Sequence, residues 1–255
     1  MSSLPLLEIC LESVESAVAA ERGGAQRVEL CANLLEGGTT PSAGTIRAAR
    51  ERLTIGISVM VRPRGGDFLY SDAEFDAMRH DITMAKELGA DGIVLGLLKP
   101  DGTVDVKRTR VLAALAAPLP VTFHRAIDVT RDLPEALEAV IAAGAARVLT
   151  SGGKSSVADA IPVVRSMTEQ AGDRIRVMPG CGITLANILD IARGTGAQEL
   201  HIALDEPVES GMNYRKPGIP MGGVADREFV TFTTAEASVR DVMKRLETLR
   251  SSVAV

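Results

Sequence analysis

The sequence predicts one α/β domain, a (β/α)8 TIM barrel that spans residues 1–255. Strand patterns alternate with helix patterns eight times, which indicates βαβ units and a parallel sheet. Eight such units in 255 residues match a closed barrel, a fold of about 250 residues. An open doubly wound sheet is the alternative, but the Gly-x-Gly-x-x-Gly turn that it favours does not follow the first strand.

The predicted strands are short runs in which apolar side chains recur at every second position. The strands lie in the stretches 7–10, 27–31, 55–61, 93–96, 121–128, 147–150, 175–178 and 199–202. In the fifth stretch Val121 and Phe123 share one face, and the pattern then breaks into charge at Arg125 and Asp128. A strand that ends in charged residues is typical of a functional site at the strand end and not of a buried core.

The predicted helices follow the strands and are bounded by capping residues and glycines. They cover 14–21, 41–53, 72–88, a segment from 105, 133–143, 156–170, 184–193 and 234–249. A loop rich in proline and glycine, 207–223, precedes the last helix and is a candidate lid or oligomer contact. No linker divides the chain into two domains.

Composition excludes several classes of protein. A net charge of −5, 3% aromatic residues and no tryptophan argue against a nucleic-acid surface. No apolar run is long enough to span a bilayer, and the first residues lack the basic segment of a signal peptide. The three cysteines, an odd number, predict reduced thiols and a cytoplasmic location.

The strands have one apolar face and one polar face. The polar face collects Glu8, Cys10, Glu29, Cys31, Arg62, Thr122, His124 and His201. Because side chains alternate along a strand, the apolar face packs against the helices and the polar face points to the barrel axis. Unpaired burial costs several kcal/mol per charge, so these groups either pair internally or line a pocket.

Two histidines and two glutamates are the candidate catalytic residues. His124 and His201 are the candidate acid and base, because the pKa of imidazole is near neutrality. Glu8 and Glu29 are candidates to orient them or to act as bases. The alternatives stay open: glutamates inside a barrel form structural bridges with arginine, and single histidines are commonly satisfied core groups.

Charged and glycine-rich loops after the strands are the candidate substrate-binding sites. Arg62, Arg64 and Arg125 offer planar forks for carboxylate or phosphate. Further candidates in these and neighbouring loops are Asp67, Asp128, Ser151, Gly152, Gly180 and Gly182. Backbone N–H groups in such glycine loops can bind an anion, although glycine also occurs there for plain turn geometry.

Cys10 and Cys31 are the candidate metal ligands. The alternative is that they are small core residues. Inward side chains on neighbouring barrel strands belong to alternate layers, so the fold does not require the two thiols to meet. Only weak metal binding is therefore expected.

Several short motifs give the chain a resemblance to a known family. They are 7–10 (Leu-Glu-Ile-Cys), 27–31 (Arg-Val-Glu-Leu-Cys), 36–38 (Glu-Gly-Gly), 62–68 (Arg-Pro-Arg-Gly-Gly-Asp-Phe), 121–128 (Val-Thr-Phe-His-Arg-Ala-Ile-Asp), 147–152 (Arg-Val-Leu-Thr-Ser-Gly) and 212–215 (Met-x-Tyr-Arg). With them the chain resembles the CutC family, named for copper homeostasis. The resemblance implies a TIM barrel, a cytoplasmic protein and an association with Cu(I), and it matches Cys10 and Cys31 to cysteines for which a copper role has been proposed. The chain departs from some relatives at Leu11, where they carry a second adjacent cysteine.

Three functions remain open at this point. The first is copper homeostasis with weak Cu(I) binding through thiols, which are soft ligands. The second is an enzyme, a lyase, isomerase or hydrolase, that acts on a small anionic or polyol substrate at the C-terminal mouth of the barrel. The third is a sensor or partner-binding barrel without chemistry. In each case we expect a small-molecule or metal ligand, no nucleic acid, no membrane and a homo-oligomer.

Overall fold

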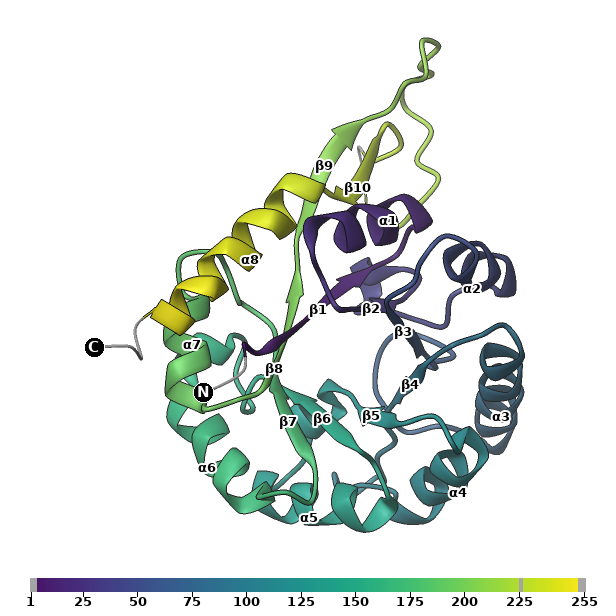
Figure 1. The fold of residues 1–255 in the computed structure, drawn as a ribbon. Helices are drawn as coiled ribbons and strands as arrows, with labels where there is room; N and C mark the ends of the chain where they lie inside the picture. Colours follow the sequence, from purple (N-terminus) through teal and green to yellow (C-terminus); the bar gives the residue numbers. More distant parts are fainter. Residues whose placement is uncertain (1–3, 225–226, 252–255) are drawn as a thin grey trace.

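The computed structural model describes residues 4–224 and 227–251, and it confirms the predicted TIM barrel (Figure 1). The two ends of the predicted 1–255 domain lie outside the described residues. They include the first residues, on which the signal-peptide prediction was based. Eight parallel strands form the barrel, and helices surround it. The sequence interpretation of alternating units is therefore correct.

The barrel strands follow one another around the ring in chain order. They are β1 (Leu6–Leu11), β2 (Arg27–Leu30), β3 (Gly56–Met60), β4 (Gly92–Leu95), β5 (Val121–Phe123), β6 (Arg147–Thr150), β7 (Arg176–Pro179) and β8 (Glu199–Ala203). β1 pairs with both β2 and β8, and all pairs are parallel. A single parallel bridge between Gly180 and His201 joins β7 to β8 and closes the ring.

The helices lie outside the strands (Figure 1). They are α1 (Val14–Gly23), α2 (Ala43–Arg50), α3 (Asp72–Glu87), α4 (Val106–Ala116), α5 (Leu133–Ala143), α6 (Ile161–Ala171), α7 (Ile188–Thr195) and α8 (Glu236–Ser251). Ser71 and Glu74 form a capping box at the start of α3. None of the helices in the described part of the chain has the length and apolar character needed to cross a membrane.

Two predicted helices start four or five residues later than the sequence pattern suggested. The segment predicted as helix 156–170 begins with a 3-10 turn, η3 (Val157–Asp159), and α6 follows it. α6 starts where Pro162 occupies its first turn, because proline lacks the N–H that a helix interior needs. Before α7, Thr184 and Asn187 exchange side-chain to backbone hydrogen bonds that shape a turn instead of helix.

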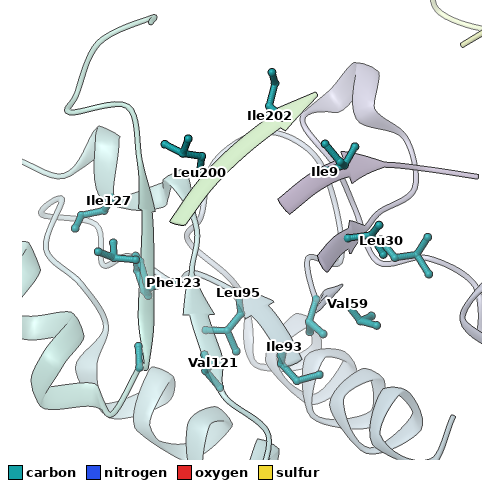
Figure 2. Packing of buried hydrophobic residues seen from close by; sticks show 14 of the residues in the cluster. Ile9, Leu30, Val59, Ile93, Leu95, Val121, Phe123, Ile127, Leu200 and Ile202 are labelled. Carbon is teal, nitrogen blue, oxygen red and sulfur yellow. The ribbon is translucent and has the colours of Figure 1, made fainter. Parts of the chain in front are cut away.

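The apolar face of the strands packs beneath the helices, as predicted. Figure 2 shows part of this layer, with the labelled residues Ile9, Leu30, Val59, Ile93, Leu95, Val121, Phe123, Ile127, Leu200 and Ile202. Each of them is almost wholly buried. Because this face supplies the core, the opposite face of the same strands is free to carry polar groups toward the axis.

A two-stranded arm projects from the barrel beyond β8 (Figure 1). β9 (Asp205–Glu209) pairs antiparallel with β10 (Val230–Thr234). The sequence predicted a loop over 207–223. This is wrong for residues 207–209, which belong to β9. Pro207 is compatible with β9 because a two-stranded sheet leaves one edge without ladder hydrogen bonds.

Candidate functional site

A cavity of about 470 Å³ opens at the C-terminal ends of the barrel strands, where TIM-barrel sites lie. Its wall includes seven of the residues that the sequence singled out. They are Cys10, Glu29, Arg62, His124, Arg125, Gly182 and His201. The polar residues of several strands therefore share one hollow, as the alternation of side chains predicted.

His201 lies between two buried carboxylates at the floor of this cavity. Its Nδ1 is 2.7 Å from Oε1 of Glu8, and its Nε2 is 3.7 Å from Oε2 of Glu29. The register explains the contact, because Glu8 on β1 is directly opposite His201 on β8. Glu8 is fully buried beneath the imidazole and does not line the cavity.

The three groups shift one another's pKa values. Burial lowers the pKa of His201, but Glu29, Cys10 and Glu8 outweigh this and raise it well above its usual value. Burial raises the pKa of Glu8, yet His201 and Arg27 lower it to about 2. Burial also raises the pKa of Glu29, which stays raised although the charge on His201 opposes the change. Glu8 and His201 therefore form a buried ion pair, and Glu29 is the more basic carboxylate.

A second charged layer, which the sequence interpretation missed, closes the barrel below Glu8. Arg27 forms ion pairs with Glu8 and Glu199, and Glu199 also pairs with Arg147. Nη1 of Arg147 donates to Oγ1 of Thr122 at 3.1 Å. The sequence pattern could have predicted this layer. Arg27 lies two positions before Glu29, and Glu199 lies two positions before His201, so each shares the inward face of its strand.

Cys10 and Cys31 meet beside Glu29, although the fold does not require it. One ligand atom from each of these three residues lies within 4.8 Å of the other two. In the register Cys10 is opposite Glu29, so Cys31 lies two residues farther along the same face, just beyond β2. Sγ of Cys31 donates to Oε2 of Glu29 at 3.5 Å.

The surroundings of both thiols raise their pKa values. The hydrogen bond with Cys31 and burial raise the pKa of Cys10 well above its usual value. The hydrogen bond with Cys10 lowers the pKa of Cys31, but burial and the carboxylate of Glu29 raise it to about 11. A metal ion at these thiols must displace protons, which opposes tight binding near neutral pH.

His124 stands directly after β5 and starts the 3-10 helix η2 (Arg125–Val129). Its Nδ1 accepts a hydrogen bond from the N–H of Ala126 at 3.2 Å. Burial and the charge of Arg62 lower the pKa of His124 to about 3, so the ring is neutral. Its ring centroid is 4.9 Å from that of Phe68.

Arg62 connects two loops at the mouth of the cavity. Its Nη1 donates to the carbonyl oxygens of Glu36 and Gly38, and its Nη2 donates to the carbonyl oxygen of Gly66, each at 2.8 Å. Its guanidinium also lies 5.1 Å from the ring centroid of Phe68. Arg62 therefore holds the Glu36-Gly-Gly loop against the loop that follows β3.

Arg64 and Asp67 shape the loop after β3 and do not line the cavity. Nε of Arg64 is 2.6 Å from Oε1 of Glu74, and its Nη2 is 3.0 Å from Oδ1 of Asp67. The two residues predicted to bind substrate thus contact each other and the start of α3.

Asp128 binds the loop after β6 from within the protein. Its carboxylate accepts hydrogen bonds from the backbone N–H groups of Ser151 and Gly153 and from the hydroxyl of Thr150. Arg125 lies 2.9 Å from Asp128 and donates to Oγ of Ser151 at 2.9 Å. The anion at this glycine turn is therefore a side chain of the protein, and Asp128, Ser151 and Gly152 lie outside the cavity wall.

The loop after β7 forms the opposite wall. Cys181, which the sequence interpretation left unassigned, lines the cavity with a left-handed φ of 71°, and its Sγ is 3.1 Å from the carbonyl oxygen of Ser155. Gly182 lines the cavity beside it. Gly180 packs against His201, since a Cβ at this position would lie 3.2 Å from Cδ2 of the imidazole.

Comparison with known proteins identifies close relatives. The model of the CutC family matches residues 5–205. A family protein CutC of Chromobacterium violaceum is 50% identical over 242 residues, which are 95% of this chain and 98% of that protein. The human copper homeostasis protein cutC homolog is 50% identical over 217 residues, 85% of this chain and 80% of the human protein.

Solved structures agree on the fold. The crystal structure of the candidate copper homeostasis protein CutC from Streptococcus agalactiae has a TM-score of 0.74 at 35% identity, and it covers 78% of this chain and 98% of that one. A thiamine phosphate pyrophosphorylase from Pyrococcus furiosus has a TM-score of 0.57 at 18% identity and covers 97% of this chain and 98% of its own. At that identity the second likeness shows a shared barrel and nothing about activity.

Proposed function

This chain belongs to the CutC family, and from that premise we propose that it binds Cu(I) weakly through Cys10 and Cys31 in a copper homeostasis role. The observation that carries the proposal is the meeting of both thiols with Glu29 within 4.8 Å. Two sulfur ligands suit Cu(I), which prefers soft donors. His201 lies beside the cluster, with its Nε2 3.7 Å from Oε2 of Glu29, and would have to lose a proton to become a nitrogen ligand.

An anaerobic competition titration with a coloured Cu(I) chelator tests this proposal. We expect wild type to take up Cu(I) and the Cys10→Ala/Cys31→Ala double variant to lose that uptake. Cys181→Ala is the matched control, because Cys181 lines the same cavity outside the cluster of Cys10, Glu29 and Cys31. Equal affinity in wild type and the double variant would remove these thiols as the site.

A second candidate function is an enzyme, because the Glu8–His201–Glu29 group resembles an acid–base arrangement. A protonated imidazole held by one carboxylate and facing a second one can donate a proton and receive it again. The reaction class remains open among lyase, isomerase and hydrolase, with a small anionic or polyol substrate.

Proton NMR of the chain with a mixture of hydroxycarboxylates, sugar phosphates and polyols tests the enzyme candidate. We expect wild type to consume a component that His201→Asn leaves intact. Equal consumption by both proteins, or none by wild type, would contradict the candidate.

Two further parts of the proposal concern the cell and the assembly. The free thiols of Cys10, Cys31 and Cys181 fit the reducing cytoplasm, and cell fractionation checks this location. We also propose a homo-oligomer. Tyr214 and Met221, between β9 and β10, are 73% and 83% exposed, and we propose this segment as the contact surface. Light scattering on the purified chain measures the state directly.

A further inference from the structure

The unpaired ring nitrogen of His124 is the most informative polar atom in the cavity. Nδ1 already accepts the N–H of Ala126, so in the neutral ring the proton resides on Nε2. His124 is 4% exposed and lines the cavity, and Nε2 has no hydrogen-bond partner among the described residues. A buried donor without an acceptor costs about 1–3 kcal/mol. An acceptor in the cavity would satisfy this donor once the side chains that enclose Nε2 shift to admit it.

Packing fixes the direction of this donor. Gly96 lies against the imidazole so closely that a Cβ there would be 2.4 Å from both Cε1 and Nδ1. The ring of Phe68 covers His124 from another side, at a centroid distance of 4.9 Å. Since the backbone N–H of Ala126 holds Nδ1, the ring is oriented before any ligand arrives.

Arg62 places an uncompensated positive charge on the same wall. It is 5% exposed, and its hydrogen bonds go to carbonyl oxygens. No carboxylate in the described part of the chain forms a salt bridge with it. Buried charges are normally paired, because removal from water is costly. An anion in the cavity would supply the missing partner.

The cavity wall also carries acidic groups. Glu29 and Asp205 line it, and Oε1 of Glu29 is buried without a hydrogen-bond partner among the described residues. A volume of about 470 Å³ is in the range of small-molecule sites, roughly 300–1,000 Å³, and is far larger than an ion needs.

We infer that this cavity binds a small organic anion, with an oxyanion that accepts the Nε2–H of His124 beside Arg62 and a hydroxyl or amine that donates to Glu29. This inference deepens the second candidate function by naming the substrate class, and it rests on that function only for turnover. Binding itself requires neither catalysis nor copper.

Matched four-carbon probes test the inference by NMR on the copper-free chain. Butyrate carries the oxyanion alone, 4-hydroxybutyrate and 4-aminobutyrate add the two kinds of donor, and 1,4-butanediol lacks the anion. We expect the anions with a donor to bind most tightly and the diol not to bind. The Nε2 resonance of His124 should shift on binding, and the chain has only three histidines to resolve. The preferred probe tells a hydroxyl ligand from an amine ligand.

Two substitutions at one position separate recognition from folding. In His124→Asn the amide oxygen can still accept the N–H of Ala126, but the donor into the cavity is gone, so affinity should fall roughly tenfold or more. His124→Gln places an amide near Nε2 and should keep most of the affinity. His80→Asn, on the exposed face of α3, is the surface control.

Three results would overturn the inference: no binding of any probe, equal binding of butanediol and the anions, or equal affinity in wild type and His124→Asn. Because these titrations contain no copper, their failure leaves the Cu(I) proposal standing. Failure of the Cu(I) titration likewise leaves this one standing. Probe binding without turnover would separate the ligand site from the enzyme candidate.

Discussion

Nδ1 of His201 lies 2.7 Å from Oε1 of Glu8, so the imidazole at the floor of the cavity is held by a carboxylate that solvent does not reach. Removal of one partner from a buried pair leaves an uncompensated charge. The same carboxylate also pairs with Arg27, which ties the site to the charged layer below it. This geometry makes Glu8 a positioning residue for His201.

Glu8→Gln is predicted to destabilise the fold strongly. The substitution keeps the size of the side chain but removes the charge that His201 and Arg27 face, and the expected loss is about 3–5 kcal/mol in the free energy of unfolding. Urea denaturation measures it. Glu138→Gln is the control, because Glu138 forms a surface pair with Arg174, and its loss should be much smaller. Equal losses would contradict the role of burial.

Gly96→Ala is predicted to displace His124. The new Cβ would lie 2.4 Å from the imidazole, so the ring must rotate or the strand end must shift. Overpacking of this kind costs about 1–3 kcal/mol. Gly211→Ala is the control, since nothing lies within 4 Å of a Cβ at that position. Histidine side-chain NMR should show a changed His124 environment in Gly96→Ala only. An unchanged His124 spectrum in that variant would contradict the prediction.

The stability of the fold is predicted to fall in acid because of His124. Its pKa is lowered from 6.5 to about 3, so the folded ring stays neutral where the unfolded ring is protonated. Unfolding then takes up a proton between these pH values, and the free energy of unfolding decreases as pH falls, by up to about 1.4 kcal/mol per pH unit. His124→Asn lacks this group and should show a shallower decrease from pH 6 to pH 4. Parallel curves for the two proteins would contradict the shift.

Gly38→Ala is predicted to weaken Cu(I) binding. Gly38 has a φ of 86°, and a Cβ there would lie 3.2 Å from Sγ of Cys31. Gly144→Ala is matched to it, with a φ of 89° and nothing within 4 Å of the added Cβ. Both variants should lose about 1 kcal/mol of stability to backbone strain. Only Gly38→Ala should lower Cu(I) affinity in the chelator titration, and equal affinities would separate this glycine from the thiols.

Much of this structure follows from the period of two along the strands. Eight strand–helix units predict the barrel, and the alternation of Leu7 and Ile9 with Glu8 and Cys10 predicts polar groups on its axis. Register is harder, because it depends on how far each strand is shifted against its neighbour. The meeting of Cys10 with Cys31 follows from such a shift and from the end of β2. Sequence alone left it open.

Loop partners were beyond the reach of sequence patterns. Asp128 looked available to a ligand, but a helical turn brings it back to the glycine loop after β6, where it accepts backbone N–H groups. Arg62 looked like a ligand-binding arginine, and it also holds two loops together through their carbonyl oxygens. In both cases several of the partners are backbone groups, which carry no residue-specific signal.

Arg27 and Arg147 form ion pairs with Glu199 at the N-terminal ends of β2, β6 and β8, the end of the barrel opposite the cavity. Together with the fully buried Glu8, these ion pairs fill the barrel axis beneath the cavity. Cys10 and His124 both line the cavity above this layer. A ligand bound at one of these residues therefore reduces the space for a ligand at the other, so Cu(I) and a small anion are expected to weaken each other's binding.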